Sequence, residues 1–260
     1  MTSWEVAWLG KKPQLRKAVL VEGLPGMGNV GKVAVDFLID NFHAKRVAEF
    51  RSQLMPHSVF VNEKGLVELP KIELYCVDRK NAPSLLLLAG DVQPVNEESC
   101  YDFCALVVGV AKEMGVVEII TTGGIGLRTV PKKPKIYVTG TSKAAVKPYA
   151  KLKVNMNTYG TVGPIVGVAG VLCGIAGREG LQSVALLAEV FGHPLYLGVR
   201  GAKEMLRVMN GRLNLKLDFN AIEREIQSLE KELTEKQQEL TNQPFGRLRG
   251  KPPEEVNYIG

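Results

Sequence analysis

The chain has 260 residues, of which 45% are hydrophobic and 23% are charged, and its formal net charge is +6. This composition is ordinary for a soluble globular protein, and the length allows one large α/β domain with an appendage or two small domains. The positive charge is not accompanied by an aromatic-studded basic stripe of the RNA-binding kind, so we expect no nucleic-acid partner.

The first residues, 1–6, have neither the basic lead nor the apolar core of a signal peptide. The most apolar stretch, 164–176, is too short to span a bilayer, so we expect a cytoplasmic protein with no membrane partner. The four cysteines form no C-x-x-C pair and are expected to be buried apolar residues: Cys76, Cys100, Cys104 and Cys173. Their spacing does not offer the ligands of a zinc site.

The first half of the chain predicts strands that alternate with helices. Strands are expected over residues 16–22, 47–50, 60–69, 71–78 and 84–89. Helices are expected over residues 30–41 and 96–114, and Gly115 should cap the second one. The runs 60–69 and 71–78 are consistent with a hairpin around residues 63–65.

The second half continues the alternation. Strands are expected over residues 116–121, 136–139 and 183–189, with a glycine-rich segment, 122–126, after the first of them. Helices are expected over residues 163–176 and 201–210. Glycines recur at helical spacing in the former: Gly163, Gly167, Gly170 and Gly174. Each costs roughly 1 kcal/mol relative to alanine, which suggests that another element or another subunit approaches this face closely. The whole pattern predicts an α/β domain over residues 1–217, with a mostly parallel sheet covered by helices on both faces.

After Leu217 the composition changes. Apolar residues spaced by threes and fours predict an amphipathic helix over residues 218–241 that lies on its own domain or forms an arm to other subunits. The seam includes Ile222, Ile226, Leu229, Leu233 and Leu240. Residues 242–260, with several prolines and glycines, are expected to form a flexible tail. Its last residues, Tyr258, Ile259 and Gly260, are a candidate docking peptide.

The turn after the first strand nearly satisfies two nucleotide-binding motifs. Gly26, Gly28 and Gly31 fit G-x-G-x-x-G, and Gly26, Gly31 and Lys32 fit the phosphate-loop pattern. A nucleotide enzyme would therefore use these four residues. In the other interpretation, the glycines make a tight turn and let the helix pack close to the sheet.

Neighbouring residues weaken both nucleotide motifs. Val33 stands where a Ser or Thr should hold magnesium, and Pro25 is unusual inside a dinucleotide-binding turn. Glu49 lies at the distance of the ribose-binding acid, but the strand continues past it. With three histidines and no G-x-S-x-G, we expect no catalytic residues and no cofactor. Asp91 and Glu189, near strand ends, are expected to be turn or capping residues.

Several motifs, in this order along the chain, resemble the proteasome assembly chaperone family. They are the turn 24–31, the segment 122–124, the pair 159–160 before the glycine-rich helix, the run 185–189 and the pair 193–194. The resemblance covers roughly residues 15–240. Within the family, the chain is similar in particular to the archaeal homologues of the second assembly-chaperone subunit type.

The resemblance implies a three-layer α/β domain related to purine nucleoside phosphorylases, but without the phosphorylase residues. It also implies a non-enzymatic homo-oligomer, a tetramer or a pentamer. Family members assist assembly of the proteasome core particle, or dock on it through C-terminal tails and open its gate without ATP. Other archaeal members are scaffolds for a small partner protein.

The tail departs from the docking motif of such activators, which is a hydrophobic residue, then Tyr, then any residue at the C-terminus. Tyr258 is third from the end, and Asn257 precedes it. We still expect the core particle as the partner. Because the tail departs from the motif, the alternative is that the protein is a scaffold for another small protein.

Overall fold

The computed structural model describes residues 3–15, 17–193, 196–224, 226 and 228. The chain divides into two compact units, Met1–Leu217 and Asp218–Gly260. In the second unit the described residues 219–224, 226 and 228 are helical, and Ile222 and Ile226 are buried. The other residues proposed for the arm and for docking lie outside the described residues: Leu229, Leu233, Leu240, Tyr258, Ile259 and Gly260.

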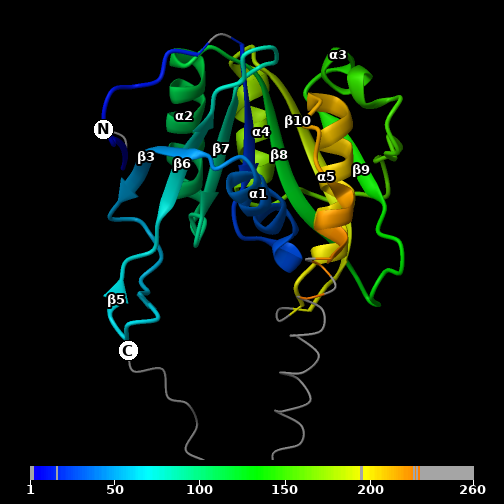
Figure 1. Cartoon of the computed structure of the whole chain (residues 1–260), viewed down its shortest axis with the longest axis horizontal. Helices are drawn as coiled ribbons and strands as arrows, with labels where there is room; N and C mark the ends of the chain where they lie inside the picture. The colour runs from blue at the N-terminus through cyan, green and yellow to red at the C-terminus, as the bar shows by residue number, and fades with distance from the viewer. Residues whose placement is uncertain (1–2, 16, 194–195, 225, 227, 229–260) are drawn as a thin grey trace, which may run out of the picture. The chain divides into compact units, whose positions relative to one another are not determined.

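An eight-stranded sheet forms the centre of the first unit (Figure 1), in the order β1-β3-β6-β7-β2-β8-β10-β9. Its strands are β1 (Trp4–Trp8), β2 (Ala18–Gly23), β3 (Lys45–Ser52), β6 (Ile72–Val77), β7 (Leu85–Gly90), β8 (Val116–Leu127), β9 (Ile136–Gly140) and β10 (Gln182–Phe191). The four strands β7, β2, β8 and β10 run parallel to one another, and the strands outside them pair antiparallel. The sheet is therefore mixed, with a parallel centre.

Helices cover both faces of this sheet. The helices α1 (Val30–Asn41) and α5 (Val199–Leu213) pack together on one face, and α2 (Glu97–Glu113) and α4 (Val168–Arg178) pack together on the other. Three short helical segments complete the unit: η1 (Met27–Asn29), α3 (Lys143–Val146) and η2 (Lys147–Tyr149). The expected three-layer α/β architecture is confirmed.

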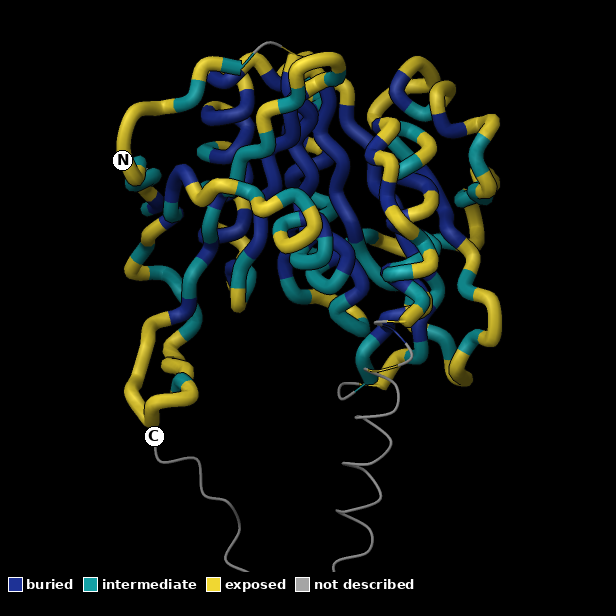
Figure 2. The backbone as a smooth tube through the Cα atoms, viewed as in Figure 1, coloured by how far each residue is buried: buried dark blue, intermediate teal, exposed yellow. Residues whose placement is uncertain are grey.

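Burial explains why the central strands are almost wholly apolar. All residues of β2 are buried, and so are five of the six residues of β7. Helices cover both faces of these strands, so their side chains have no solvent-facing side. Figure 2 shows the buried centre between exposed outer helix faces.

The expected turn around residues 63–65 is confirmed, and it joins the two strands of a separate sheet, β4 (Phe60–Val61) and β5 (Val67–Glu68). The run 60–69, expected as one strand, is divided by this turn, and β6 pairs with β3 and β7 instead. Gly65 has φ +71 in its turn, a conformation that glycine adopts without a steric penalty. The hairpin projects from the sheet and is exposed along its length (Figure 2).

β1 was not predicted from the sequence. It pairs antiparallel with β3, and the Trp4 ring lies 4.8 Å from that of Phe103, between their centroids. The Trp4 indole also donates a hydrogen bond of 3.0 Å to Ser99 Oγ on α2. The apolar alternation of Trp4, Val6 and Trp8 was the available sequence signal.

The largest boundary errors are at the end of β8 and at the start of α4 (Val168–Arg178). β8 runs on to Leu127 because the segment 122–126, expected to follow the strand, continues to pair with β10. The helix expected from Gly163 begins only at Val168, because Gly167 has φ +81 and cannot continue a helix. Of the spaced glycines, Gly170 packs against the carbonyl of Ile165, but a Cβ at Gly174 would meet open space.

The glycine turn joins β2 to α1 at close quarters. A Cβ on Gly31 would lie 2.0 Å from Thr122 Oγ1 of β8, so only glycine allows this helix to pack so near the sheet. Gly28 has φ +62 and lies against Val190. These contacts favour the architectural interpretation of the two glycines.

We predict that Gly31→Ala destabilises the protein by about 1–3 kcal/mol, because the added methyl group overpacks the junction of α1 and β8. Gly109→Ala is the matched control. Gly109 is an exposed glycine of α2 whose Cβ would meet no atom within 4 Å, so alanine there should stabilise by about 0.4–1 kcal/mol. Urea unfolding measures both changes, and equal effects of the two substitutions would contradict the packing argument.

Candidate functional site

A pocket of about 430 Å³ lies at the carboxyl ends of β2 and β8. Its walls are the turn after β2, the glycine-rich end of β8 and the loop before α4, and they include Glu22, Gln93 and Leu187. The adjacent strands β2 and β7 lead into α1 and α2, which lie on opposite faces of the sheet. In open α/β sheets, such a switch point is where ligands bind. The volume is also in the range of ligand sites, about 300–1,000 Å³.

The side-chain amide of Gln93 connects two walls of this pocket. Its Nε2 donates to the Pro25 carbonyl at 2.7 Å, and its Oε1 accepts from the Val168 backbone N–H, the first of α4, at 3.1 Å. A Cβ on Gly167 would lie 2.5 Å from Gln93 Oε1, so glycine makes room for the amide. The glycine turn and the start of α4 are thus held in a defined arrangement.

Glu22 is the one titratable side chain among the described residues that line the pocket, and it is buried. Its carboxylate accepts hydrogen bonds from the backbone N–H groups of Leu24, at 2.9 Å, and Thr122, at 3.2 Å. The Thr122 hydroxyl donates to the Glu22 carbonyl at 2.7 Å. Burial raises the pKa of Glu22 to about 7, and the two N–H groups oppose this rise.

The negative charge of Glu22 disfavours the thiolate forms of two cysteines of α2, Cys100 and Cys104. The hydrogen bond with Cys100, together with burial, raises the pKa of the Cys104 thiol well above its ordinary value. Both cysteines are buried, as the sequence predicted, and so is Cys173, while Cys76 is half-buried. Cys104 is therefore a neutral thiol within the hydrophobic core.

Of the four nucleotide-motif residues, Gly26 lines the pocket, whereas Gly28, Gly31 and Lys32 do not. The Lys32 ammonium pairs with Asp36 at 2.8 Å. Glu49, at the distance of a ribose-binding acid, lies on β3 and pairs with Arg51 at 3.1 Å. The one cation of the motif is therefore directed to Asp36 along α1 rather than into the pocket.

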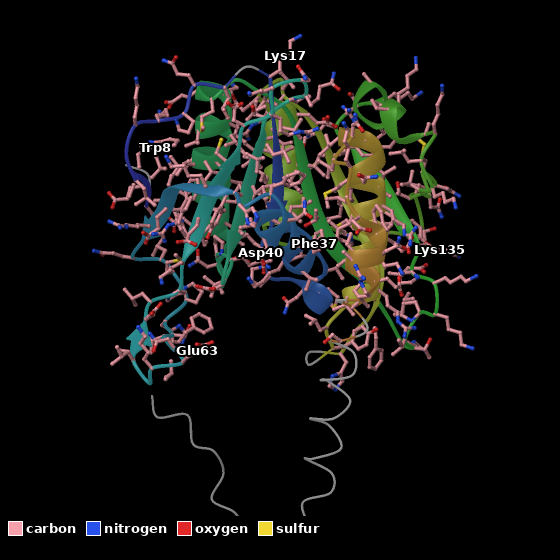
Figure 3. All side chains as sticks on the ribbon, in the orientation of Figure 1. Trp8, Lys17, Phe37, Asp40, Glu63 and Lys135 are labelled. Carbon is pink, nitrogen blue, oxygen red and sulfur yellow. The ribbon has the colours of Figure 1, made fainter. Side chains whose placement is uncertain are left out.

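The two acids near strand ends have structural partners. Asp91 accepts from the Lys71 backbone N–H at 3.0 Å, and Glu189 accepts from the Lys135 backbone N–H at 3.0 Å. Neither lines the pocket. Lys135, labelled in Figure 3, immediately precedes β9.

Within the described ranges, no group of three or more His, Cys, Asp and Glu side chains comes together to hold a metal ion. None of the helices in the part of the chain that the structure describes combines the length and the apolar character needed to cross a bilayer.

Residues 20–237 match the model of a known family, the PAC2 family. The chain belongs to the PAC2 family. It is also 28% identical over 248 residues to the uncharacterized protein MJ1210 of Methanocaldococcus jannaschii. This match covers 95% of this chain and 93% of that protein.

Solved structures have the same fold. PbaB of Pyrococcus furiosus, described as an archaeal proteasome activator, matches with a TM-score of 0.81 and 27% identity. The match covers 91% of this chain and 100% of PbaB. PbaA of the same organism, described as an archaeal homolog of proteasome-assembly chaperone, matches at 0.74 and 24% identity over 91% of this chain and 93% of that one. The predicted resemblance to this family is confirmed.

The sequence interpretation missed Glu22 and Gln93 as site residues. A signal for Glu22 was available, since it is the one charged residue in the buried run Ala18–Gly23, immediately before the glycine turn. An acid in a wholly buried strand needs a local reason. Gln93 has no comparable signal, because its two partners are distant in sequence.

Glu22 predicts a pH-dependent stability. Its pKa rises from an ordinary 4.5 to about 7 on folding, so between these values the folded state binds more protons than the unfolded state. The contribution of Glu22 to stability is therefore greatest below the lower value and is lost as the pH rises through about 7, by about 3 kcal/mol. Glu22→Gln should remove this component of the difference in unfolding free energy between pH 5 and pH 8.

Glu63→Gln is the control, because Glu63 lies at the exposed tip of the β4–β5 hairpin (Figure 3). Its unfolding free energy should have the pH dependence of the unmodified protein. Urea titrations at the two pH values measure all three proteins, and an unchanged pH dependence in Glu22→Gln would contradict the assignment.

Proposed function

We propose that this protein is a non-enzymatic homo-oligomer that binds the proteasome core particle through its tail. It acts as an assembly factor or as an ATP-independent activator. The observation that carries this proposal is the similarity to PbaB, an archaeal proteasome activator, at 27% identity over the whole of PbaB. The proposal includes that the protein is archaeal and cytoplasmic.

An exposed apolar surface supports the homo-oligomer, for which we propose a tetramer or a pentamer. The β4–β5 hairpin and its flanks carry six exposed apolar residues: Val59, Phe60, Val61, Leu66, Val67 and Leu69. A concentration of exposed apolar residues in one short hairpin is typical of a protein–protein contact. The hairpin is therefore a candidate contact between subunits.

The proposed arm gives a second route to self-association. Its seam of apolar residues at helical spacing continues from Ile222 and Ile226 to Leu229, Leu233 and Leu240. In an oligomer, each subunit contributes one tail, and several tails that bind one core particle gain affinity through their high effective concentration. Each tail can then bind weakly.

The sequence of the tail also gives weight to a second candidate partner. Tyr258 stands one position away from the place of the tyrosine in the family's docking motif. In the alternative, the protein is a scaffold for another small protein. A pull-down from native lysate distinguishes the two: recovery of core-particle subunits fits the proposal, and recovery of a small protein without them fits the scaffold.

Deletion of residues 258–260 should abolish the stimulation of peptide hydrolysis by the core particle, because the proposed docking group is lost. The oligomer should remain intact by light scattering. The double substitution Pro252→Ala and Pro253→Ala is the control, since it alters the tail away from its tip and should retain stimulation. A truncated protein that stimulates as well as the full chain would rule out docking through the tail.

Leu233→Asp should lower the mass of the oligomer in light scattering, because it places a charge in the apolar seam of the proposed arm. Ser228→Asp is the matched control: it adds the same charge at an exposed helical position. Loss of mass in both variants, or in neither, would count against the seam as an oligomer contact.

A further inference from the structure

We propose that the pocket at the carboxyl ends of β2 and β8 binds a small organic cation, a guanidinium group on an apolar stem, with Glu22 as its anionic partner. This inference goes beyond the proposed function and does not depend on it, since the pocket lies wholly within the first unit.

The first argument is the charge of Glu22. Its carboxylate is buried, and its hydrogen-bond partners are two backbone N–H groups, which carry no net charge. Among the described residues that line the pocket there is no Lys, Arg or His. A buried carboxylate is costly unless it is paired with a cation, and a cationic ligand would supply that pair.

The second argument is the unused hydrogen-bonding capacity of the same carboxylate. A carboxylate has about four acceptor positions, two on each oxygen. Leu24 occupies one position on Oε1, and Thr122 occupies one on Oε2. Each oxygen therefore has one position left. A guanidinium group presents parallel N–H donors that match the two oxygens of a carboxylate.

The third argument is the apolar character of the remaining walls. They include the side chains of Leu24, Met27, Ile165 and Leu187. A ligand that fits must therefore combine a cationic head with an apolar stem. A phosphate group does not fit, since Glu22 repels it and Lys32 is paired with Asp36 outside the pocket.

The pH dependence of binding follows from the same geometry. The ligand binds the ionised carboxylate, whose pKa is about 7, so affinity should fall about tenfold per pH unit below 7. Cys100 and Cys104 of α2 are the other titratable groups near Glu22. The walls from β8, the glycine turn and the loop before α4 contribute no further titratable side chain among the described residues.

The test is isothermal titration calorimetry of the full chain with n-butylguanidinium at pH 8. The control ligand is n-butylurea, which has a similar shape without the charge. We expect saturable binding of n-butylguanidinium, at least about tenfold tighter than that of n-butylurea, and weaker binding at pH 6. Equal affinity for the two ligands, or no saturable binding of the cation, would overturn the proposal.

Two variants locate the site. Glu22→Gln should weaken n-butylguanidinium binding at least about tenfold. The amide oxygen of this variant can replace only one carboxylate oxygen as acceptor for the backbone N–H groups of Leu24 and Thr122, so the variant is open to misfolding. Gly163→Leu keeps the carboxylate. Gly163 lines the pocket, and a Cβ there meets no atom within 4 Å, so the leucine has room to occupy the cavity.

Gly163→Leu should also weaken binding at least about tenfold while it retains the thermal unfolding midpoint of the unmodified protein. Gly109→Leu, a similarly open position on α2, should bind n-butylguanidinium as the unmodified protein does. Unchanged affinity in a folded Gly163→Leu or a folded Glu22→Gln places the ligand elsewhere and overturns the assignment.

Discussion

Gly31 and Thr122 hold α1 against β8 at a distance that leaves no room for a side chain between them. This approach decides much else at the same edge of the sheet. The Thr122 hydroxyl reaches the Glu22 carbonyl, and the Thr122 N–H reaches the Glu22 carboxylate. The close junction thus fixes the positions of the end of β2, the start of α1 and the end of β8 relative to one another. The turn after β2 and the end of β8 are two of the pocket walls.

The same junction accounts for the resemblance of the turn to nucleotide-binding loops. Both kinds of turn join a buried strand to a helix at short range, so both need glycine where the backbone leaves no space. This turn differs from a nucleotide-binding loop in where its charged side chains lie. Here Lys32 pairs with Asp36 along α1, and the charge at the pocket is the carboxylate of Glu22. The turn thus resembles a phosphate-binding loop in its glycines, but the charge beside it is negative, which favours a cation.

Membership of the PAC2 family and the match to PbaB relate the whole first unit to one fold. In this fold the parallel centre, β7-β2-β8-β10, supports the pocket, whereas the antiparallel strands beyond β7 support the exposed hairpin. The proposed subunit contact and the proposed ligand pocket thus belong to different parts of the sheet. The proposed subunit contact and the proposed pocket ligand can be tested separately for this reason.

The sequence by itself determined the α/β class, the bounds of α1, the caps of α2 and the position of the hairpin, because each depends on local patterns of apolar residues, caps and glycines. Only the tertiary structure decided the continuation of β8, the start of α4, the pairing of β1 and the place of Glu22 in a pocket. These features depend on partners far away in the chain, such as Leu187 for Gly123 and Gln93 for Val168. No local pattern encodes such partners, because the chain must fold before they meet.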